Sequence, residues 1–145
     1  MMGVSGSPER LQTVAILAAS VNDADIIEMS LRTAGMRNPI VRHATVDGLI
    51  DALARVDGAD TIAVAIVESG AWTRLQAWRE SQQQTSLVPV AIVFDEASDL
   101  AAFAGDGPKE AVGILRPFAA KSFIRVLERL SCRWLLTGSM GESAV

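Results

Sequence analysis

The stretch that decides the fold is TVAILAASVND, from Thr13 to Asp23. Its apolar run, residues 14–19, shows no alternation of apolar and polar side chains, which is typical of a strand in a parallel sheet covered on both faces. In open α/β sheets the ligand or reaction site lies beyond the carboxyl ends of the strands. That position holds Ala18 and Ala19 here, and their methyl side chains carry no reactive group.

Predicted strands and helices alternate along the rest of the chain. Apolar runs of strand length predict further strands at residues 61–67, 90–94 and 112–115. A short strand is also expected at residues 40–44, after Pro39, which restricts the residue before it to extended geometry. Apolar residues at helical spacing predict a helix after each strand, and the longest of these helices is expected over residues 118–136.

The first two helices carry recognisable end signals. Asn22-Asp23 is expected to cap a helix over residues 23–34, and Gly35 is placed to end it. Either Thr45 or Asp47 can cap the second helix. These signals support an order in which each strand leads directly into a helix.

The order is therefore βα repeated five times. Such alternation predicts an α/β fold, with a parallel sheet, helices on both faces and right-handed crossovers. We expect the flavodoxin-like, doubly wound (βα)5 fold with a five-stranded parallel sheet of order 2-1-3-4-5. The domain is expected over residues 11–138, between a mobile leader at 1–10 and a mobile tail at 139–145.

Composition excludes several classes of function. The chain has 145 residues, half of them apolar, which suits one compact domain with a sizeable core. A net charge of -4 argues against nucleic acid as a partner. No apolar run approaches the ~18 residues that a membrane span needs. The single cysteine, Cys132, rules out an internal disulfide and fits the reducing cytoplasm.

Several short motifs lie at spacings that characterise one protein family. They are Leu31-Arg32-Thr33-Ala34-Gly35, Asn38-Pro39, Asp47-Gly48, Leu115-Arg116-Pro117-Phe118 and Arg133-Trp134-Leu135. Over residues 13–137 the chain resembles the receiver domain of two-component response regulators, and its pattern is most similar to the stand-alone regulators that serve phytochrome-type histidine kinases. The resemblance implies a cytoplasmic signalling protein whose partner is a histidine kinase or a downstream regulator.

The chemistry of receiver domains depends on clustered acids. Two carboxylates after the first strand and one at the end of the third hold a Mg²⁺ ion, and the last of them accepts the phosphoryl group. The resemblance places the acidic pair at Ala18 and Ala19 and the acceptor at Ala65. Alanine can neither bind a metal ion nor accept a phosphoryl group, so the reaction is expected to be lost.

The resemblance assigns the remaining pocket positions in the same way. The family's Thr or Ser falls on Phe94, with Asp95 directly after it, and the family's Lys falls on Arg116. Arginine keeps the positive charge but not the compact ammonium geometry. We expect a degenerate phosphorylation pocket with no cofactor and no metal ion, in a protein that is not an enzyme and acts through protein contacts.

Three other interpretations remain open. A different register of the third strand would put Glu68 in the acceptor's place, where it could imitate a phosphorylated aspartate permanently. Separately, the chain could be a phosphorelay receiver that uses Glu68 or Asp95 as its phosphoryl acceptor. Alternatively, a small molecule could bind in the space near Ala18, Ala65 and Phe94.

The last predicted helix offers a surface. Lys121, Arg125, Arg129 and Arg133 lie four residues apart and form a basic stripe, which is either a solvated face or a docking surface. The resemblance implies that the fourth helix, fifth strand and fifth helix form the output and dimer face. Trp134 and Leu135 are expected to make a self-association contact there, which predicts a homodimer.

Three other polar residues are interpreted structurally. Asp23 and Asp25 fit stabilisation of a helix dipole better than metal binding. His43 has no acid or cysteine at ligand spacing and is taken as an ordinary strand residue.

Overall fold

The structure is a computed structural model that describes residues 12–55, 62–81, 88–106, 111–116, 119–130, 132 and 134–137. For residues 104–106, 134 and 137 the description covers the backbone only. The expected leader, the expected tail and Arg133 lie outside the described residues. The domain limits at residues 11 and 138 therefore stay a prediction.

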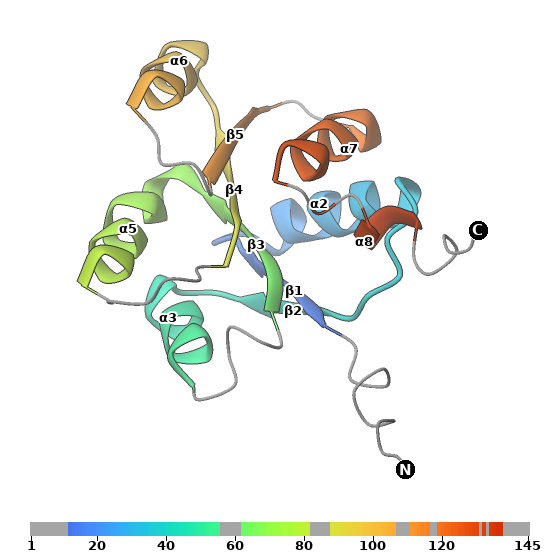
Figure 1. The fold of residues 1–145 in the computed structure, drawn as a ribbon, viewed down its shortest axis with the longest axis horizontal. Helices are drawn as coiled ribbons and strands as arrows, with labels where there is room; N and C mark the ends of the chain where they lie inside the picture. The colour runs from blue at the N-terminus through green and yellow to red at the C-terminus, as the bar shows by residue number, and fades with distance from the viewer. Residues whose placement is uncertain are drawn as a thin grey trace.

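Five parallel strands form one sheet (Figure 1). They are β1 (Thr13–Leu17), β2 (Ile40–His43), β3 (Ile62–Glu68), β4 (Val90–Phe94) and β5 (Ala111–Leu115). Their order is β2-β1-β3-β4-β5, so the predicted doubly wound topology is confirmed. All five lie close to the predicted positions. The apolar runs mark the strands that helices cover on both faces, whereas β2, with the sequence IVRH, is an edge strand that is partly exposed.

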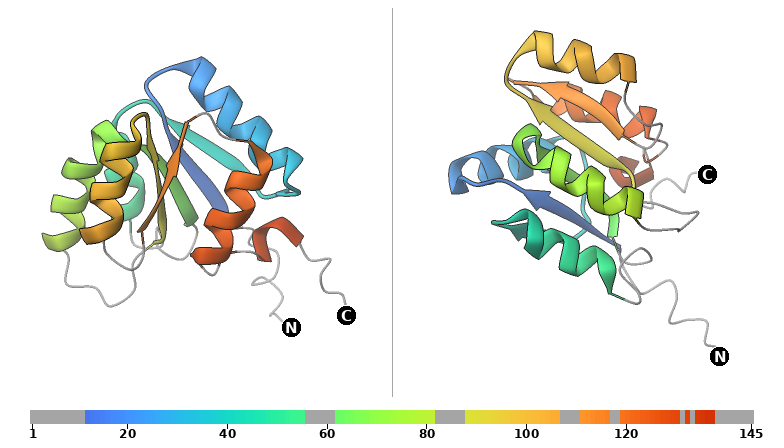
Figure 2. Two further views of the ribbon diagram at one scale, coloured as in Figure 1. Left: turned by 90° about the horizontal axis from the view of Figure 1, so that it is seen from above. Right: turned by 90° about the vertical axis from the view of Figure 1, so that its left-hand side faces the viewer.

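Helices cover both faces of the sheet (Figure 2). They are α2 (Val21–Thr33), α3 (Val46–Ala54), the short 3₁₀ helix η1 (Ser69–Ala71), α5 (Trp72–Ser81), α6 (Ala97–Asp106), α7 (Ala120–Arg129) and α8 (Trp134–Thr137). One face carries α2, α7 and α8, and the other carries α3, α5 and α6. No helix in the described ranges is long and apolar enough to cross a membrane.

The sheet separates two apolar cores. Val14 and Ile16 of β1 belong to the core under α2 and α7, where Phe123 is fully buried. Ala15 and Leu17, the alternate residues of the same strand, belong to the core under α3, α5 and α6. Because successive strand residues point to opposite faces, a strand covered on both sides must be apolar at every position.

The caps of α2 refine one prediction and confirm another. The N-cap is Ser20, whose Oγ accepts a hydrogen bond from the Asp23 N–H at 3.2 Å, so the predicted Asn22-Asp23 cap is wrong by two to three residues. The strand ends at Leu17 and the chain turns at once, which brings the serine to the cap position. Gly35 lies just after the helix with φ of +111°, as expected for a residue that ends a helix in the left-handed region.

The cap of α3 is resolved in favour of one of the two candidates. Thr45 has extended backbone angles, and its Oγ1 accepts a hydrogen bond from the Gly48 N–H at 3.1 Å. Asp47 lies in the first turn of the helix instead, where a negative charge stabilises the helix dipole.

The last predicted helix is wrong in one respect, because it is broken. Helix α7 ends at Arg129, and the Cys132 N–H donates to the Leu127 carbonyl oxygen at 2.7 Å before α8 begins. The turn carries Leu135 back into the core, where it is fully buried in one cluster with Met36. The expected role of Leu135 in a dimer surface is therefore overturned, since its side chain is covered by this chain's own residues.

Candidate functional site at the carboxyl edge of the sheet

The candidate site is formed by the residues that follow four neighbouring strands. Ala18 and Ala19 follow β1, Glu68 ends β3, Asp95 follows β4 and Arg116 follows β5. Parallel pairing aligns these ends: Leu17 lies opposite Val67, and Phe94 lies opposite Leu115. The predicted pocket residues therefore gather at one edge, with Ala65 and Phe94 as the exceptions.

Ala65 does not lie at this edge. The register between β1 and β3 pairs it with Ala15, three residues before the end of β3, and it is fully buried. The prediction that Ala65 stands at the position of the phosphoryl acceptor, at the end of β3, is therefore wrong. The apolar run gave no sign of where the strand stops, whereas pairing with β1 places Glu68 level with the residue after Leu17.

Glu68 reaches across to the loop that follows β1. Its Oε2 accepts a hydrogen bond from the Ala19 N–H at 2.6 Å. A charge-assisted hydrogen bond of this length is among the stronger polar contacts in proteins. The alternative register considered from the sequence is thus the one that fits the sheet, and Glu68 ties the end of β3 to the start of α2.

Arg116 holds two carboxylates at once. Its Nε donates to Asp95 Oδ1 at 2.7 Å, and its Nη1 donates to Asp23 Oδ1 at 3.1 Å. The Arg116 and Asp23 side chains are only 26% and 31% exposed, whereas Asp95 is 71% exposed. The guanidinium therefore bridges the first turn of α2 and the loop between β4 and α6.

Asp23 is the site residue that sequence reasoning missed. It lies in the first turn of α2, so the expected dipole role is compatible with its position, but it is also paired with Arg116. The two residues are 93 positions apart, and no local pattern joins them. They come together only because β1 and β5 belong to one parallel sheet, in which the carboxyl ends of all the strands lie at the same edge.

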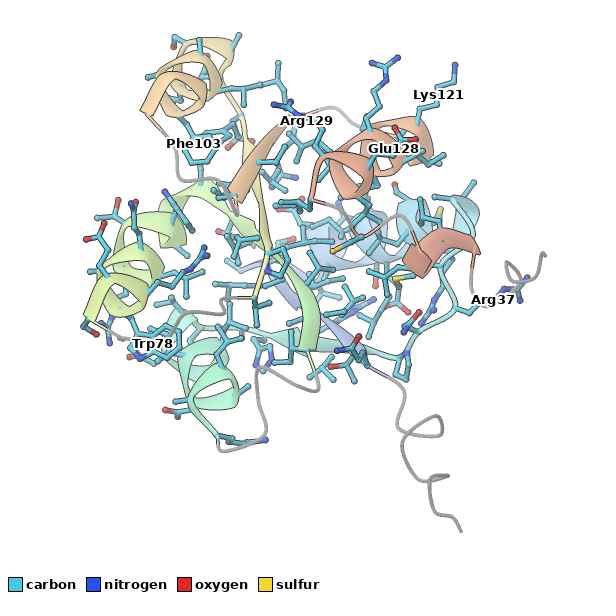
Figure 3. The ribbon with its side chains drawn as sticks, in the orientation of Figure 1. Arg37, Trp78, Phe103, Lys121, Glu128 and Arg129 are labelled. Carbon is cyan, nitrogen blue, oxygen red and sulfur yellow. The ribbon has the colours of Figure 1, made fainter. Side chains whose placement is uncertain are left out.

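Phe94 belongs to the core and does not line the edge. Its ring is 6% exposed and lies 5.4 Å from the ring of Phe103 in α6. It also lies over Gly113 of β5, where an added Cβ would be 3.0 Å from Phe94 Cε2 and would collide with Leu100. Figure 3 shows Phe103 beneath α6, on the side that faces α5.

The proposed small-molecule space is not formed by its expected residues. Ala18 belongs to the core under α2 and α7, while Ala65 and Phe94 belong to the core on the opposite face of the sheet. The three residues therefore do not surround one common space, which is a correction to that interpretation.

The edge does not fit a Mg²⁺ ion. Within the described ranges, no three His, Cys, Asp or Glu residues are grouped so that they could hold a metal ion. Mg²⁺ requires several oxygen ligands in near-octahedral geometry. A divalent ion bound to Asp23 and Asp95 would also have to displace the Arg116 guanidinium that both carboxylates already contact.

The basic stripe is described for three of its four expected residues. Lys121, Arg125 and Arg129 are exposed on α7, together with Glu128, while Arg133 lies outside the described residues. Figure 3 shows Lys121 projecting from α7 away from the sheet. The side chain of Trp134 is also outside the described part of the chain, so its expected contact stays a prediction.

Two titratable groups outside the Arg116 and Glu68 contacts have shifted pKa values. Partial burial, with a smaller contribution from the nearby Arg55 charge, lowers the pKa of His43. Burial raises the pKa of the Cys132 thiol, whose Sγ donates to the Leu130 carbonyl oxygen. His43 is the last residue of β2 and lies opposite Leu17, so it stands at the carboxyl end of the outermost strand, whereas Cys132 follows α7.

Similar proteins were found by structure alone. No protein-family model and no curated protein matches this chain. Solved structures of similar fold include the bacteriophytochrome response regulator AtBRR, with a TM-score of 0.68 and 13% identity over 86% of this chain and 95% of that one. They also include the chemotaxis response regulator CheY4 of Vibrio cholerae, with a TM-score of 0.60 and 16% identity over 83% of this chain and 98% of that one.

A receiver domain protein from Clostridium thermocellum gives a similar result, with a TM-score of 0.59 and 16% identity over 87% of this chain and 99% of that one. At such low identity these likenesses establish the fold and nothing further. The chain thus has the flavodoxin-like fold of response regulator receiver domains.

Proposed function

We propose that this protein is an atypical receiver domain that acts in cytoplasmic signal transduction by binding other proteins, without being phosphorylated. It is not an enzyme and uses no cofactor. The observation that carries the proposal is the composition of the carboxyl edge: alanines follow β1, and the nearby carboxylates of Glu68, Asp95 and Asp23 are engaged by groups of the chain itself.

The chemistry of phosphoryl transfer supports this proposal. Transfer requires a divalent ion and positioned cations to neutralise charge on the moving phosphoryl group. The edge offers no group of carboxylates, among the described residues, that could hold such an ion. A fixed hydrogen bond from the Ala19 N–H to Glu68 instead places a permanent carboxylate beside the end of β1.

The partner is proposed to be a signalling protein, either a histidine kinase or a downstream regulator. The similar structures are those of response regulators, and one of them, AtBRR, is a bacteriophytochrome response regulator. The fold likeness favours the same broad role for this chain, while the altered edge favours a role that does not depend on phosphorylation.

Phosphorylation assays test the proposal directly. The purified chain is incubated with Mg²⁺ and either acetyl phosphate or a phosphorylated histidine kinase, beside a receiver domain with an intact acidic pair as the positive control. We expect no labelled protein and no mass increase in this chain. Stable incorporation of a phosphoryl group would overturn the proposal.

A phosphorelay role is the second candidate, because the register places Glu68 at the end of β3. If label does appear, the variants Glu68→Gln and Asp95→Asn identify the acceptor. Loss of label in one of them would support the relay, whereas label that persists in both would exclude these two carboxylates.

Self-association is proposed to use the basic surface of α7, formed by the exposed Lys121, Arg125 and Arg129, with Arg133 and Trp134 beyond it. Charge reversal by Lys121→Glu together with Arg125→Glu is expected to leave only monomer in solution. Light scattering measures the mass. An unchanged dimer in the variant, or a wild-type chain that is monomeric at high concentration, would contradict the dimer.

A further inference from the structure

We propose that the chain's own charged side chains form a clasp across the carboxyl edge, and that this clasp holds α6 and the start of α2 in place with no bound ligand. The clasp consists of the Arg116 guanidinium with the Asp23 and Asp95 carboxylates, and of the Glu68 carboxylate with the Ala19 N–H. This inference concerns how the edge is held together, and it can be tested on the isolated chain whether or not the proposed function is right.

The contacts of the clasp join connections that are distant in sequence. Arg116 follows β5, Asp95 precedes α6, and Asp23 lies in the first turn of α2. Glu68 joins the end of β3 to the same loop before α2, through the Ala19 N–H. The ends of four strands are therefore tied together, and the loop between β1 and α2 is held from both sides.

Partial burial distinguishes the Arg116–Asp23 pair of this clasp from an ordinary surface ion pair, whereas the Asp95 side chain is 71% exposed. The Arg116 and Asp23 side chains are 26% and 31% exposed, whereas the pair between Arg74 and Asp47 is 58% and 70% exposed. Exposed pairs contribute little because solvent screens them. Removing one partner from a less exposed pair leaves the other charge poorly solvated, which costs considerably more.

The clasp acts on α6 together with apolar packing. The backbone N–H of Arg116 donates to the Phe94 carbonyl oxygen at 2.9 Å, and Asp95 directly follows Phe94 in the chain. The Phe94 ring contacts Phe103 in α6 and lies over Gly113. The amino end of α6 is thus fixed by charge at Asp95, while its middle is fixed by the two aromatic rings.

The clasp also holds like charges beside one another. The Asp23 and Asp95 carboxylates each lie within 3.1 Å of the same guanidinium. Without that guanidinium the two carboxylates would repel each other, because nothing between them would carry a positive charge. Loss of Arg116 should therefore open the edge, and removal of one acid should partly close it again.

Hydrogen exchange followed by mass spectrometry tests the clasp in the free chain. In Arg116→Met we expect amides of residues 21–25 and 97–103 to exchange about tenfold faster, since a hydrogen bond to a charged group contributes roughly the free energy of one decade. Amides of α3 should be unchanged. The matched control is Arg74→Met, which removes an exposed pair of similar length and should not alter exchange at the edge.

Equal exchange in Arg116→Met and Arg74→Met would overturn the clasp, and so would faster exchange spread evenly over all helices. The double variant Arg116→Met with Asp23→Asn should recover part of the lost protection, and failure to recover any would also overturn it. If Arg116→Met does not fold, Arg116→Lys keeps the charge and should show a smaller increase confined to the same residues.

Discussion

Two arginines in this molecule each bind two carboxylates, yet they do different things. Arg42 in β2 contacts Asp25 and Glu28 of α2, at 2.8 and 2.7 Å. Arg116 contacts Asp23 and Asp95 at similar distances. The first group joins one helix to the edge strand beside it, whereas the second joins three connections that meet beyond the ends of the strands.

The comparison shows that the position of an ion pair in the fold matters more than its geometry. Hydrogen bonds from Arg42 to Glu28 and then to Asp25 raise the pKa of that guanidinium. Its side chain is 38% exposed, and Asp25 is 55% exposed. Arg42 therefore fastens the flank of the sheet, while Arg116 organises its carboxyl edge.

The largest expected effect that tests the distinction between the two arginines is a difference in the free energy of unfolding between two matched variants. Arg116→Met should lower the free energy of unfolding by about 2 kcal/mol, because it removes the charged hydrogen bonds to the exposed Asp95 and to the partly buried Asp23, whose carboxylate then loses its cation. Arg42→Met should lower it less. Urea unfolding followed by the fluorescence of the tryptophans measures both, and an Arg42 variant as unstable as the Arg116 variant would contradict the distinction.

The other half of the edge can be tested at Glu68. Glu68→Ala should lower stability by about 1 kcal/mol, since the Ala19 N–H loses its acceptor. Glu68→Gln should lower it less, because its amide oxygen can still accept that hydrogen bond. Chemical denaturation measures both variants. Equal losses in the two would mean that negative charge, and not hydrogen bonding, is what the position requires.

Salt should separate the two arginines further. Raising the salt concentration toward 1 M shortens the Debye length to about 3 Å and screens exposed charges most. We expect the difference between wild type and Arg42→Met to shrink more than the difference between wild type and Arg116→Met. Unfolding curves at low and high NaCl provide the test, and an equal reduction for both variants would remove burial as the explanation.

The smallest expected effect is a pH dependence of the free energy of unfolding that comes from His43, the residue after Arg42 in β2. Its folded pKa lies below the unfolded value of about 6.5, so between these two values the unfolded chain binds more protons. The contribution of His43 to the free energy of unfolding should therefore be fully present above about pH 6.5 and should be lost as the pH drops below that value. Denaturation at several pH values checks this, and His43→Gln should flatten that part of the profile.

The sequence was sufficient to predict the topology but not the ends of its elements. Five strand-length segments separated by helical segments leave few arrangements of a parallel sheet, so the strand order followed. The end of β3 was placed wrongly relative to the site because a continuous apolar run does not mark its own last residue. The end of β3 could be located only from its pairing with β1, which sets Glu68 beside Ala19.

The last helix and the Arg116 contacts were beyond sequence reasoning for different reasons. Leu127, Leu130 and Trp134 keep a helical spacing, so the break after Arg129 leaves no trace in the periodicity. It is decided by where Leu135 can be buried. The pairing of Asp23 with Arg116 spans 93 residues and depends on the assembled sheet.

The close approach of α8 to Gly35 has an evolutionary consequence. Gly35 has φ of +111°, and a Cβ built there would lie 2.7 Å from the Leu136 carbonyl oxygen. Two separate constraints therefore require glycine at position 35: its positive φ angle and the close approach of the Leu136 carbonyl oxygen. Among related sequences, glycine at position 35 and an apolar residue at position 135 should be inherited together, and chains that lose the folded-back turn should be free to vary at both.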